Sequence, residues 1–154
     1  MNVSQKDGVT VIQLTGGSAT QSFSREFIPK IRDVILEHIG CKAIVITGEG
    51  RFFSAGADLV AFQKSIDEGN SVELIRYLTG ILHPLLLKMR TSETIFVAAL
   101  NGASAGGGLG LALACDARIA SPGGKMAASY SLSLIHISEP TRQAEISYAV
   151  FCLK

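Results

Sequence analysis

Short apolar segments that alternate with amphipathic ones are the feature that most constrains how this chain can fold. Residues 42–47 and 95–100 are nearly unbroken apolar runs, as in strands of a parallel sheet whose two faces are both covered. Residues 9–14 are rich in β-branched side chains and end before a Thr-Gly-Gly turn, which predicts another strand. A fourth strand is expected over residues 117–120.

The segments between these strands carry apolar side chains at helical spacing. Residues 24–39 place their isoleucines, valine and phenylalanine on one face, which predicts a helix. Further helices are expected over 58–63, 71–90 and 109–115, and Pro84 is expected to kink or break the helix that contains it. Strands that alternate with helices predict an α/β fold with parallel strands.

Composition and charge exclude several classes of function. The chain of 154 residues is 47% hydrophobic, which is enough for one globular core. Its 14 basic and 13 acidic side chains are interspersed, which argues against binding to nucleic acid or to an anionic membrane. No apolar run is long enough to cross a bilayer and no secretory signal follows Met1, so a cytoplasmic location is expected. The three cysteines lack the spacing of a metal site, so no metal is expected.

The last part of the chain, from about residue 132, differs in character from the rest. Two stretches of it resemble translations of two segments of a sequencing-library adapter, in the correct order and reading frame. We therefore divide the chain into a partial domain over residues 1–131 and a non-native tail over 132–154, with a divergent natural C-terminus as the alternative. On this interpretation His136 and Cys152 have no functional meaning.

Two glycine-rich loops each follow a predicted buried strand and each lead into a predicted helix. The first reads G-R-F-F-S-A-G-A-D-L over residues 50–59, and the second reads N-G-A-S-A-G-G-G-L-G over residues 101–110. Glycine lets the backbone turn sharply and lets a ligand lie against peptide groups. The start of a helix leaves N–H groups that are unpaired and slightly positive. Both loops are therefore suited to hold an anion.

The motifs F-S-A-G-A-D-L and N-G-x-x-x-G-G-G-L-G together resemble the paired signature of the enoyl-CoA hydratase/isomerase family, also called the crotonase family. The resemblance covers the chain up to about Tyr130. It implies an α/β fold with a spiral of ββα units, truncated here before the C-terminal helical part of the family. It also implies an acyl-CoA thioester as the substrate, no separate cofactor because coenzyme A is part of that substrate, and a full-length parent that is a homotrimer or hexamer.

By this resemblance, two backbone amides form an oxyanion hole. The N–H groups of Ala57 and Gly107 would donate to the thioester carbonyl oxygen. Fixed donors lower the barrier to moving a proton beside the thioester by roughly 3 kcal/mol each, because that step puts charge on this oxygen. The other residues expected at the substrate are Ser54, Ala55, Gly56, Asp58, Leu59, Gly106 and Gly108.

The acid and base positions differ from those of typical hydratases in the family. Those enzymes have a glutamate two residues after the G-G-G run, where this chain has Gly110, which cannot transfer a proton. Their second glutamate would fall near Ser131. An isomerase-type parent is therefore favoured over a two-glutamate hydratase, and the chain as given is expected to lack its proton-transfer group and to be inactive. For the nearby carboxylates, Asp58 and Asp116, we expect capping and turn roles.

Two other functions remain open from the sequence. Residues 102–106 match G-x-S-x-G between a strand and a helix, so an esterase that uses Ser104 as its nucleophile is the main rival. It would also need a downstream acid and histidine, and the downstream histidine, His136, lies in the adapter-like tail. The third function is a noncatalytic fragment that binds coenzyme A.

Overall fold

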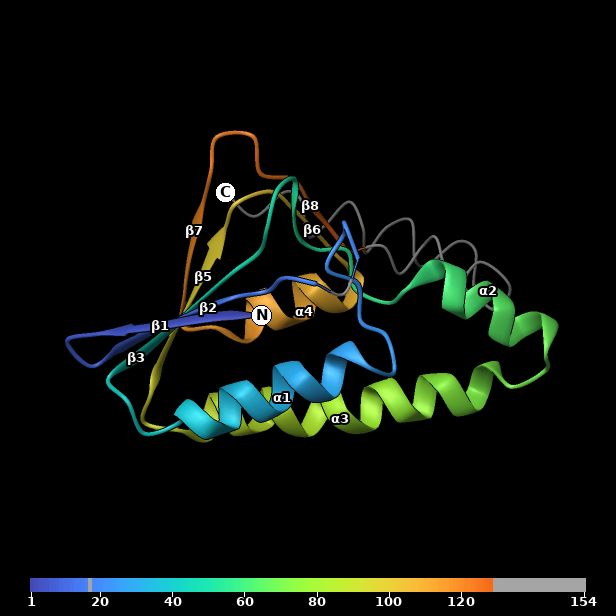
Figure 1. Ribbon diagram of the computed structural model, residues 1–154, viewed down its shortest axis with the longest axis horizontal. Helices are drawn as coiled ribbons and strands as arrows, with labels where there is room; N and C mark the ends of the chain where they lie inside the picture. The colour runs from blue at the N-terminus through green and yellow to red at the C-terminus, as the bar shows by residue number, and fades with distance from the viewer. Residues whose placement is uncertain (17, 129–154) are drawn as a thin grey trace, which may run out of the picture.

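The computed structural model describes residues 1–16 and 18–128 and contains a five-stranded sheet. Its strands follow the order β1-β2-β3-β5-β7 (Figure 1). β1 pairs antiparallel with β2, and the other neighbours are parallel. The five strands are β1 (Asn2–Lys6), β2 (Val9–Gln13), β3 (Ala43–Thr47), β5 (Ile95–Leu100) and β7 (Ala117–Ala120). The four strands predicted from the sequence are confirmed, whereas β1 was not anticipated. The predicted division near residue 131 lies outside the described residues.

A second sheet of three parallel strands is built from the segments that follow β3, β5 and β7. Its members are β4 (Phe52–Ser54), β6 (Ala103–Ala105) and β8 (Met126–Ala127). β3, β5 and β7 of the first sheet are thus each followed by a short strand of the second, and the chain then turns into a helix after β4 and after β6. This succession agrees with the expected spiral of ββα units, and it places both glycine-rich loops at the second sheet.

Four helices accompany the two sheets in the part of the chain that the structure describes. They are α1 (Phe27–His38), α2 (Leu59–Asp67), α3 (Ser71–Thr91) and α4 (Gly106–Ala114). α1 and α3 pack side by side, and α4 lies between them and the sheets (Figure 1). Of the predicted kink or break at Pro84, the break is wrong, because α3 continues through this residue. Leu85 and Met89, just after the proline, are buried in the core and hold that half of the helix in place.

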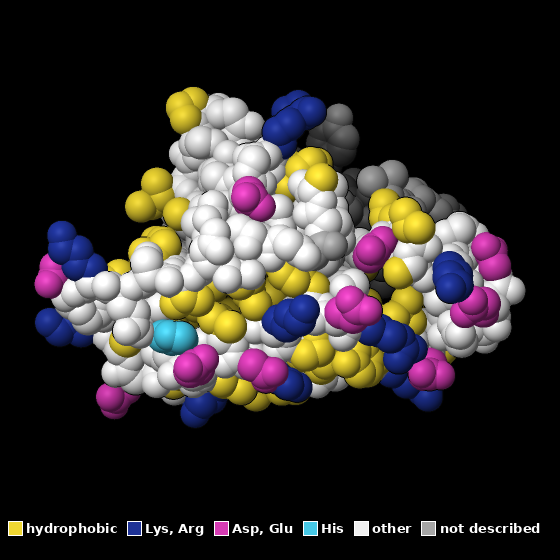
Figure 2. Space-filling view, viewed as in Figure 1, with side chains coloured by type: hydrophobic (Ala, Val, Ile, Leu, Met, Phe, Trp, Pro, Cys, Tyr) yellow, Lys and Arg dark blue, Asp and Glu magenta, His cyan; other side chains and the backbone are white. Residues whose placement is uncertain are grey.

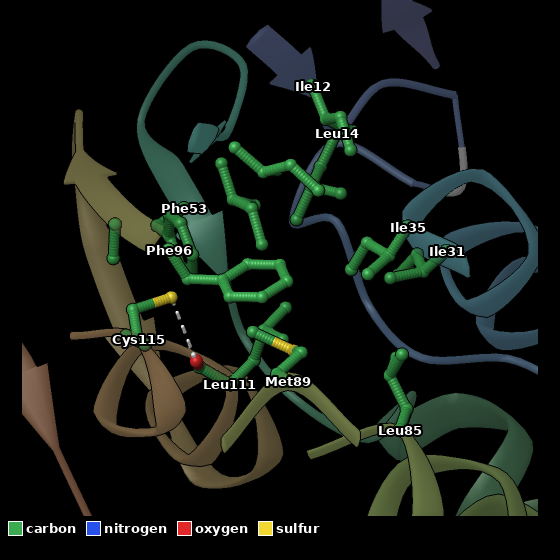
Figure 3. Close-up of a cluster of buried hydrophobic side chains, with 14 of the residues drawn as sticks. Ile12, Leu14, Ile31, Ile35, Phe53, Leu85, Met89, Phe96, Leu111 and Cys115 are labelled. Carbon is green, nitrogen blue, oxygen red and sulfur yellow. Dashed lines mark hydrogen bonds between the residues drawn. The ribbon is translucent and has the colours of Figure 1, made fainter. Parts of the chain in front are cut away.

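The hydrophobic core lies between the first sheet and the helices. Figure 3 shows side chains from β2, α1, β4, α3, β5 and α4 converging on it, with Phe53 of β4 and Phe96 of β5 among them. Ile44 and Ile46 of β3 are fully buried, but Val45 between them is only half-buried. The expectation that β3 and β5 are covered on both faces is therefore corrected: these strands alternate, because the helices cover one face of the sheet. The face seen in Figure 2 carries intermixed basic and acidic side chains over the helices.

No helix in the described residues is long and apolar enough to span a membrane.

Candidate active site

The first glycine-rich loop is held by the buried side chain of Ser54, the last residue of β4. Its hydroxyl donates to the carbonyl of Gln21 at 2.8 Å and accepts from the N–H of Gly56 at 3.2 Å. The N–H of Ala55 donates to the carbonyl of Thr20 at 2.9 Å. The turn after β4 is therefore anchored to the segment before α1 by both side chain and backbone.

Ala57 forms an isolated parallel bridge with Phe23. The N–H of Phe23 donates to the carbonyl of Gly56 at 2.6 Å, and the N–H of Asp58 donates to the carbonyl of Phe23 at 3.3 Å. In a parallel bridge of this kind, the partner bonds the residues on either side, so the N–H of the central residue points the other way. The N–H of Ala57 thus faces away from Phe23, and Ala57 itself is exposed.

Asp58 and Leu59 follow at the start of α2. The Asp58 carboxylate accepts from the N–H groups of Val60 at 3.0 Å and Ala61 at 3.2 Å, so the predicted helix-capping role is confirmed. The side chain of Leu59 is 72% exposed. Asp58 therefore has a structural role as the cap of α2, whereas the side chain of Leu59 is accessible for contact with another molecule.

The second loop needs glycine because other backbone segments pass very close to it. A methyl carbon added at Gly102 would lie 2.2 Å from the carbonyl oxygen of Arg51, and one added at Gly108 would lie 2.4 Å from that of Ser54. Gly106 has a φ of +50° and begins α4, so Gly107 lies in the first turn of that helix. N–H groups in a first turn have no acceptor within the helix.

The two loops meet at Gly56 and Gly107. Gly56 has a φ of +81°, and a methyl carbon added there would lie 2.7 Å from the nitrogen of Gly107 and 2.7 Å from the carbonyl oxygen of Ala105. The structure thus brings together the two segments that the sequence singled out, although about 50 residues separate them along the chain. Gly106 is also near, because a carbon added there would lie 3.9 Å from the carbonyl oxygen of Ala55.

Two residues at this junction were missed by sequence reasoning. Phe23 pairs with the first loop, and a methyl carbon added at Gly107 would meet its ring at 3.1 Å. Asn101, the first residue of the second loop, hydrogen-bonds to the segment that leads into β4. A polar residue at the end of a buried strand was a usable signal for Asn101, but no local pattern marks Phe23.

The other carboxylate noted in the sequence, Asp116, has a structural role. It lies between α4 and β7, where its Oδ2 accepts from the N–H of Phe96 at 2.8 Å and its Oδ1 pairs with Arg90 at 3.1 Å. The predicted turn role is confirmed. Gly110 lies inside α4, and an added methyl carbon there would meet nothing within 4 Å. The described residues therefore leave room for a side chain at position 110, although the residue at that position is a glycine.

Ser104 does not occupy a nucleophile elbow. It is the middle residue of β6, it is 1% exposed, and its register partners are Ser54 on β4 and Met126 on β8. The nucleophile of an esterase must project from the turn between a strand and a helix. The two histidines in the described residues, His38 and His83, belong to α1 and α3. The esterase interpretation is therefore corrected: the hydroxyl is enclosed within the second sheet.

The thiol of Cys115, just after α4, is the buried ionisable group beside this region. Burial raises its pKa from the ordinary value of 9.0 to about 12; the Asp116 carboxylate adds to the rise and Arg118 opposes it. The thiol donates to the carbonyl of Leu111 at 3.5 Å (Figure 3). It therefore stays protonated and acts as a core side chain.

An open hollow of about 490 Å³ is lined in part by Gln21, whose carbonyl anchors Ser54. Its lining contains one charged side chain, that of Glu49. A carboxylate repels phosphate, so these lining residues are not arranged to bind the phosphates of a nucleotide.

Comparison with known proteins identifies the family. Residues 4–137 match the sequence model of the enoyl-CoA hydratase/isomerase family. A probable enoyl-CoA hydratase of Bacillus subtilis (strain 168) is 35% identical over 124 residues, which are 80% of this chain and 46% of that protein. A 4-chlorobenzoyl coenzyme A dehalogenase of an Arthrobacter species is 32% identical over 124 residues, with 75% and 43% covered.

Solved structures agree with the sequence comparison. The crystal structure of an enoyl-CoA hydratase from Polaromonas sp. JS666 superposes with a TM-score of 0.75 at 27% identity, over 85% of this chain and 51% of that one. The chain spans about half the length of the relatives it matches. The matched region includes both glycine-rich loops, and the chain belongs to the enoyl-CoA hydratase/isomerase, or crotonase, family.

Proposed function

We propose that this chain binds the thioester of an acyl-CoA and holds its carbonyl oxygen between the backbone N–H groups of Ala57 and Gly107. The reaction it serves is of the isomerase type: a proton leaves one carbon of the acyl chain, charge collects on the thioester oxygen as an enolate, and a proton returns at another carbon. The observation that carries the proposal is the contact between Gly56 and Gly107, which sets the two loops against each other.

Two features support the choice of donors. The bridge to Phe23 directs the N–H of Ala57 away from the protein segment that binds its neighbours, and Ala57 is exposed. The N–H of Gly107 belongs to the first turn of α4, where the helix dipole adds partial positive charge. Donors that are already oriented cost no reorganisation as charge develops on an oxygen, and each is worth roughly 3 kcal/mol.

The remaining residues predicted at the site divide into two groups. Ala55, Gly56, Leu59, Gly106 and Gly108 line the path that the substrate would take along the two loops. Ser54 and Asp58 act indirectly, because the hydroxyl of Ser54 is buried and bonded within the protein and the carboxylate of Asp58 caps α2. We therefore assign these two side chains to holding the turn rather than to touching the thioester.

The isomerase-type reaction is favoured over two-glutamate hydration by Gly110. Typical hydratases of the family have a glutamate at this position, whereas this chain has a glycine, and a carbon added there would meet no atom of the described residues within 4 Å. A water molecule that attacks a double bond needs a base to orient it. Without a side chain at 110, one of the two groups that do this in hydratases is missing.

A noncatalytic role in binding coenzyme A thioesters is the second candidate. It is favoured by the carboxylates, because Asp58 and Asp116 are both committed to structural hydrogen bonds. A site that polarises a thioester but has no base beside it binds without turning over. The two candidates share the oxyanion hole and differ in proton transfer.

The oxyanion hole can be tested with Ala57→Pro, which removes the N–H donor. The bridge leaves this N–H outside the internal hydrogen bonds, so the substitution deletes a proposed ligand contact without deleting a structural one. Ala57→Val, which adds bulk and keeps the N–H, is the matched control. The probes are acetoacetyl-CoA, which has the thioester carbonyl, and free coenzyme A, which does not; calorimetry gives both dissociation constants.

We expect the unmodified chain and Ala57→Val to bind acetoacetyl-CoA more tightly than coenzyme A, and Ala57→Pro to lose most of that preference. A chain that binds neither probe, or a preference that survives in Ala57→Pro, contradicts the proposal. Exchange of the protons next to the thioester of butyryl-CoA with deuterated water, followed by NMR, separates the two candidates. Exchange by this chain would reveal a base within it and support the enzyme, whereas binding without exchange agrees with the expected loss of the proton-transfer group and supports the noncatalytic role of the chain as given.

A further inference from the structure

The side-chain amide of Asn101 connects the two glycine-rich loops. Asn101 comes directly after β5, and its Oδ1 accepts from the N–H of Gly48 at 2.8 Å and from the hydroxyl of Thr47 at 3.4 Å. Its Nδ2 donates to the carbonyls of Gly50 at 3.1 Å and Phe52 at 3.2 Å. All four bonds go to the segment that runs from the end of β3 into β4.

These bonds act on both sides of the candidate site. Phe52 begins β4, and that strand ends only three residues before Ala57. On the other side, Asn101 is followed by Gly102, which packs against the carbonyl of Arg51, and by Ala103, whose N–H donates to the same carbonyl at 2.9 Å. β4 lies within the first loop and β6 within the second, and the two strands pair in parallel. Ala57 and Gly107 follow these strands by three and two residues, respectively.

We infer that Asn101 is a positioning residue for the oxyanion hole: it fixes how far apart the backbone N–H groups of Ala57 and Gly107 lie. This inference rests on the proposed function. Asn101 lies at the strand end, before the glycines of its own loop, and acts through the backbone rather than on the substrate. An amide is required because its oxygen accepts from the two donors while its nitrogen donates to the two carbonyls. A carboxylate in place of the amide would put an oxygen, which cannot donate, next to the carbonyl oxygens of Gly50 and Phe52.

Asn101→Ala tests the inference, because it removes all four bonds and adds no new charge. Gln5→Ala is the control: it removes an exposed amide on β1 whose Nε2 donates to the hydroxyl of Thr10 at 3.2 Å, toward the end of β2 and β3 opposite to the loops. The measured quantity is the ratio of the dissociation constants for coenzyme A and acetoacetyl-CoA. Alongside it, the ultraviolet absorption of bound acetoacetyl-CoA reports how far the ligand is converted to its enolate.

We expect the ratio to fall by about tenfold in Asn101→Ala, since a donor moved out of line loses most of a charge-assisted hydrogen bond. The enolate absorption should fall with it, whereas the affinity for coenzyme A itself changes little. Gln5→Ala should keep both values. A ratio and an absorption that stay unchanged in Asn101→Ala overturn the inference. So does an equal loss of affinity for both probes, which indicates a general structural role.

Two further arms keep the result interpretable. If the unmodified chain binds neither probe, the proposed function fails. If the unmodified chain binds as expected and Asn101→Ala behaves in the same way, the inference alone fails. Should Asn101→Ala not fold by circular dichroism, Asn101→Asp replaces it, because it keeps the acceptor half of the contacts. A preference for acetoacetyl-CoA that survives unchanged in Asn101→Asp overturns the inference in the same way.

Discussion

Gly56 and Gly107 lie so close that a methyl carbon added to Gly56 would stand 2.7 Å from the backbone nitrogen of Gly107. A carbon atom cannot come this close to a nitrogen to which it is not bonded unless one of the two atoms is displaced. The atoms nearest to the added carbon, the Gly107 nitrogen and the Ala105 carbonyl oxygen, both belong to the backbone and not to a flexible side chain. Gly56 is also in the left-handed region, with a φ of +81°. The junction of the two loops therefore depends on the absence of a side chain at this position for two separate reasons.

Gly56→Ala should destabilise the protein by more than about 3 kcal/mol, the sum of a left-handed alanine at roughly 1–2 kcal/mol and the displacement of packed backbone. The matched control is Gly69→Ala. Gly69 has a similar φ of +72° but nothing within 4 Å of the added carbon, so its cost is about 1 kcal/mol. Urea unfolding followed by circular dichroism measures both. Equal losses of unfolding free energy in the two variants would mean that the close approach of Gly56 to Gly107 does not contribute to the cost.

The long elements were predictable because their physics is local. The strands β2, β3, β5 and β7 and the amphipathic face of α1 follow from the spacing of apolar side chains. The start of α2 follows from Asp58, which caps it. Pro84 misled because its local effect is outweighed by the buried side chains around it, so tertiary packing and not propensity decides the length of α3.

The second sheet was not predictable in the same way. β4 and β6 have three residues each and β8 has two, too few for an alternating pattern to appear. The pairing of β4 with β6 joins segments about 50 residues apart along the chain, so no local pattern predicts it. The resemblance of the two motifs predicted which backbone N–H groups form the site, whereas the hydrogen bonds of Phe23 and Asn101 to the first loop became visible only in three dimensions.

Ser54 and Ser104 are register partners on β4 and β6, yet their substitutions should differ. Ser54→Ala leaves the carbonyl of Gln21 and the N–H of Gly56 without their buried partner, at a cost of roughly 2–4 kcal/mol. Among the described residues, the hydroxyl of Ser104 has no hydrogen-bond partner, so Ser104→Ala should be neutral or stabilising by up to about 1 kcal/mol. Thermal unfolding of the two variants distinguishes them. A fluorophosphonate that labels Ser104 would contradict the enclosed position of its hydroxyl.

Within α4, Gly108 and Gly110 are two residues apart and face different surroundings. Gly108→Ala would set a methyl carbon 2.4 Å from the carbonyl oxygen of Ser54 and should destabilise the protein by more than about 2 kcal/mol. Gly110→Ala meets open space and should stabilise the protein by roughly 0.5–1 kcal/mol through helix propensity. Chemical unfolding measures both changes. A loss of stability in Gly110→Ala would show that the space beside this position is occupied.

Cys115 should make the folded protein less stable in alkaline solution. Burial raises its pKa from 9.0 to about 12, so above about pH 9 the unfolded chain releases a proton that the folded chain retains. The protonated thiol's contribution is complete below the unfolded pKa and is lost as the pH rises toward the folded one, by about 1.4 kcal/mol per pH unit. Urea unfolding between about pH 8 and about pH 10.5 should therefore show a decline of roughly 2 kcal/mol from this group.

Cys115→Ala removes the thiol and should flatten the decline by that amount, although the variant starts from a lower stability at neutral pH because a buried side chain is shortened. Leu111→Val is the matched control: it also shortens a fully buried side chain and adds no ionisable group. It should lower stability at every pH and keep the decline of the unmodified chain. If the curves for Cys115→Ala and the unmodified chain run parallel through this range, the thiol does not carry the alkaline loss, and its burial does not oppose ionisation.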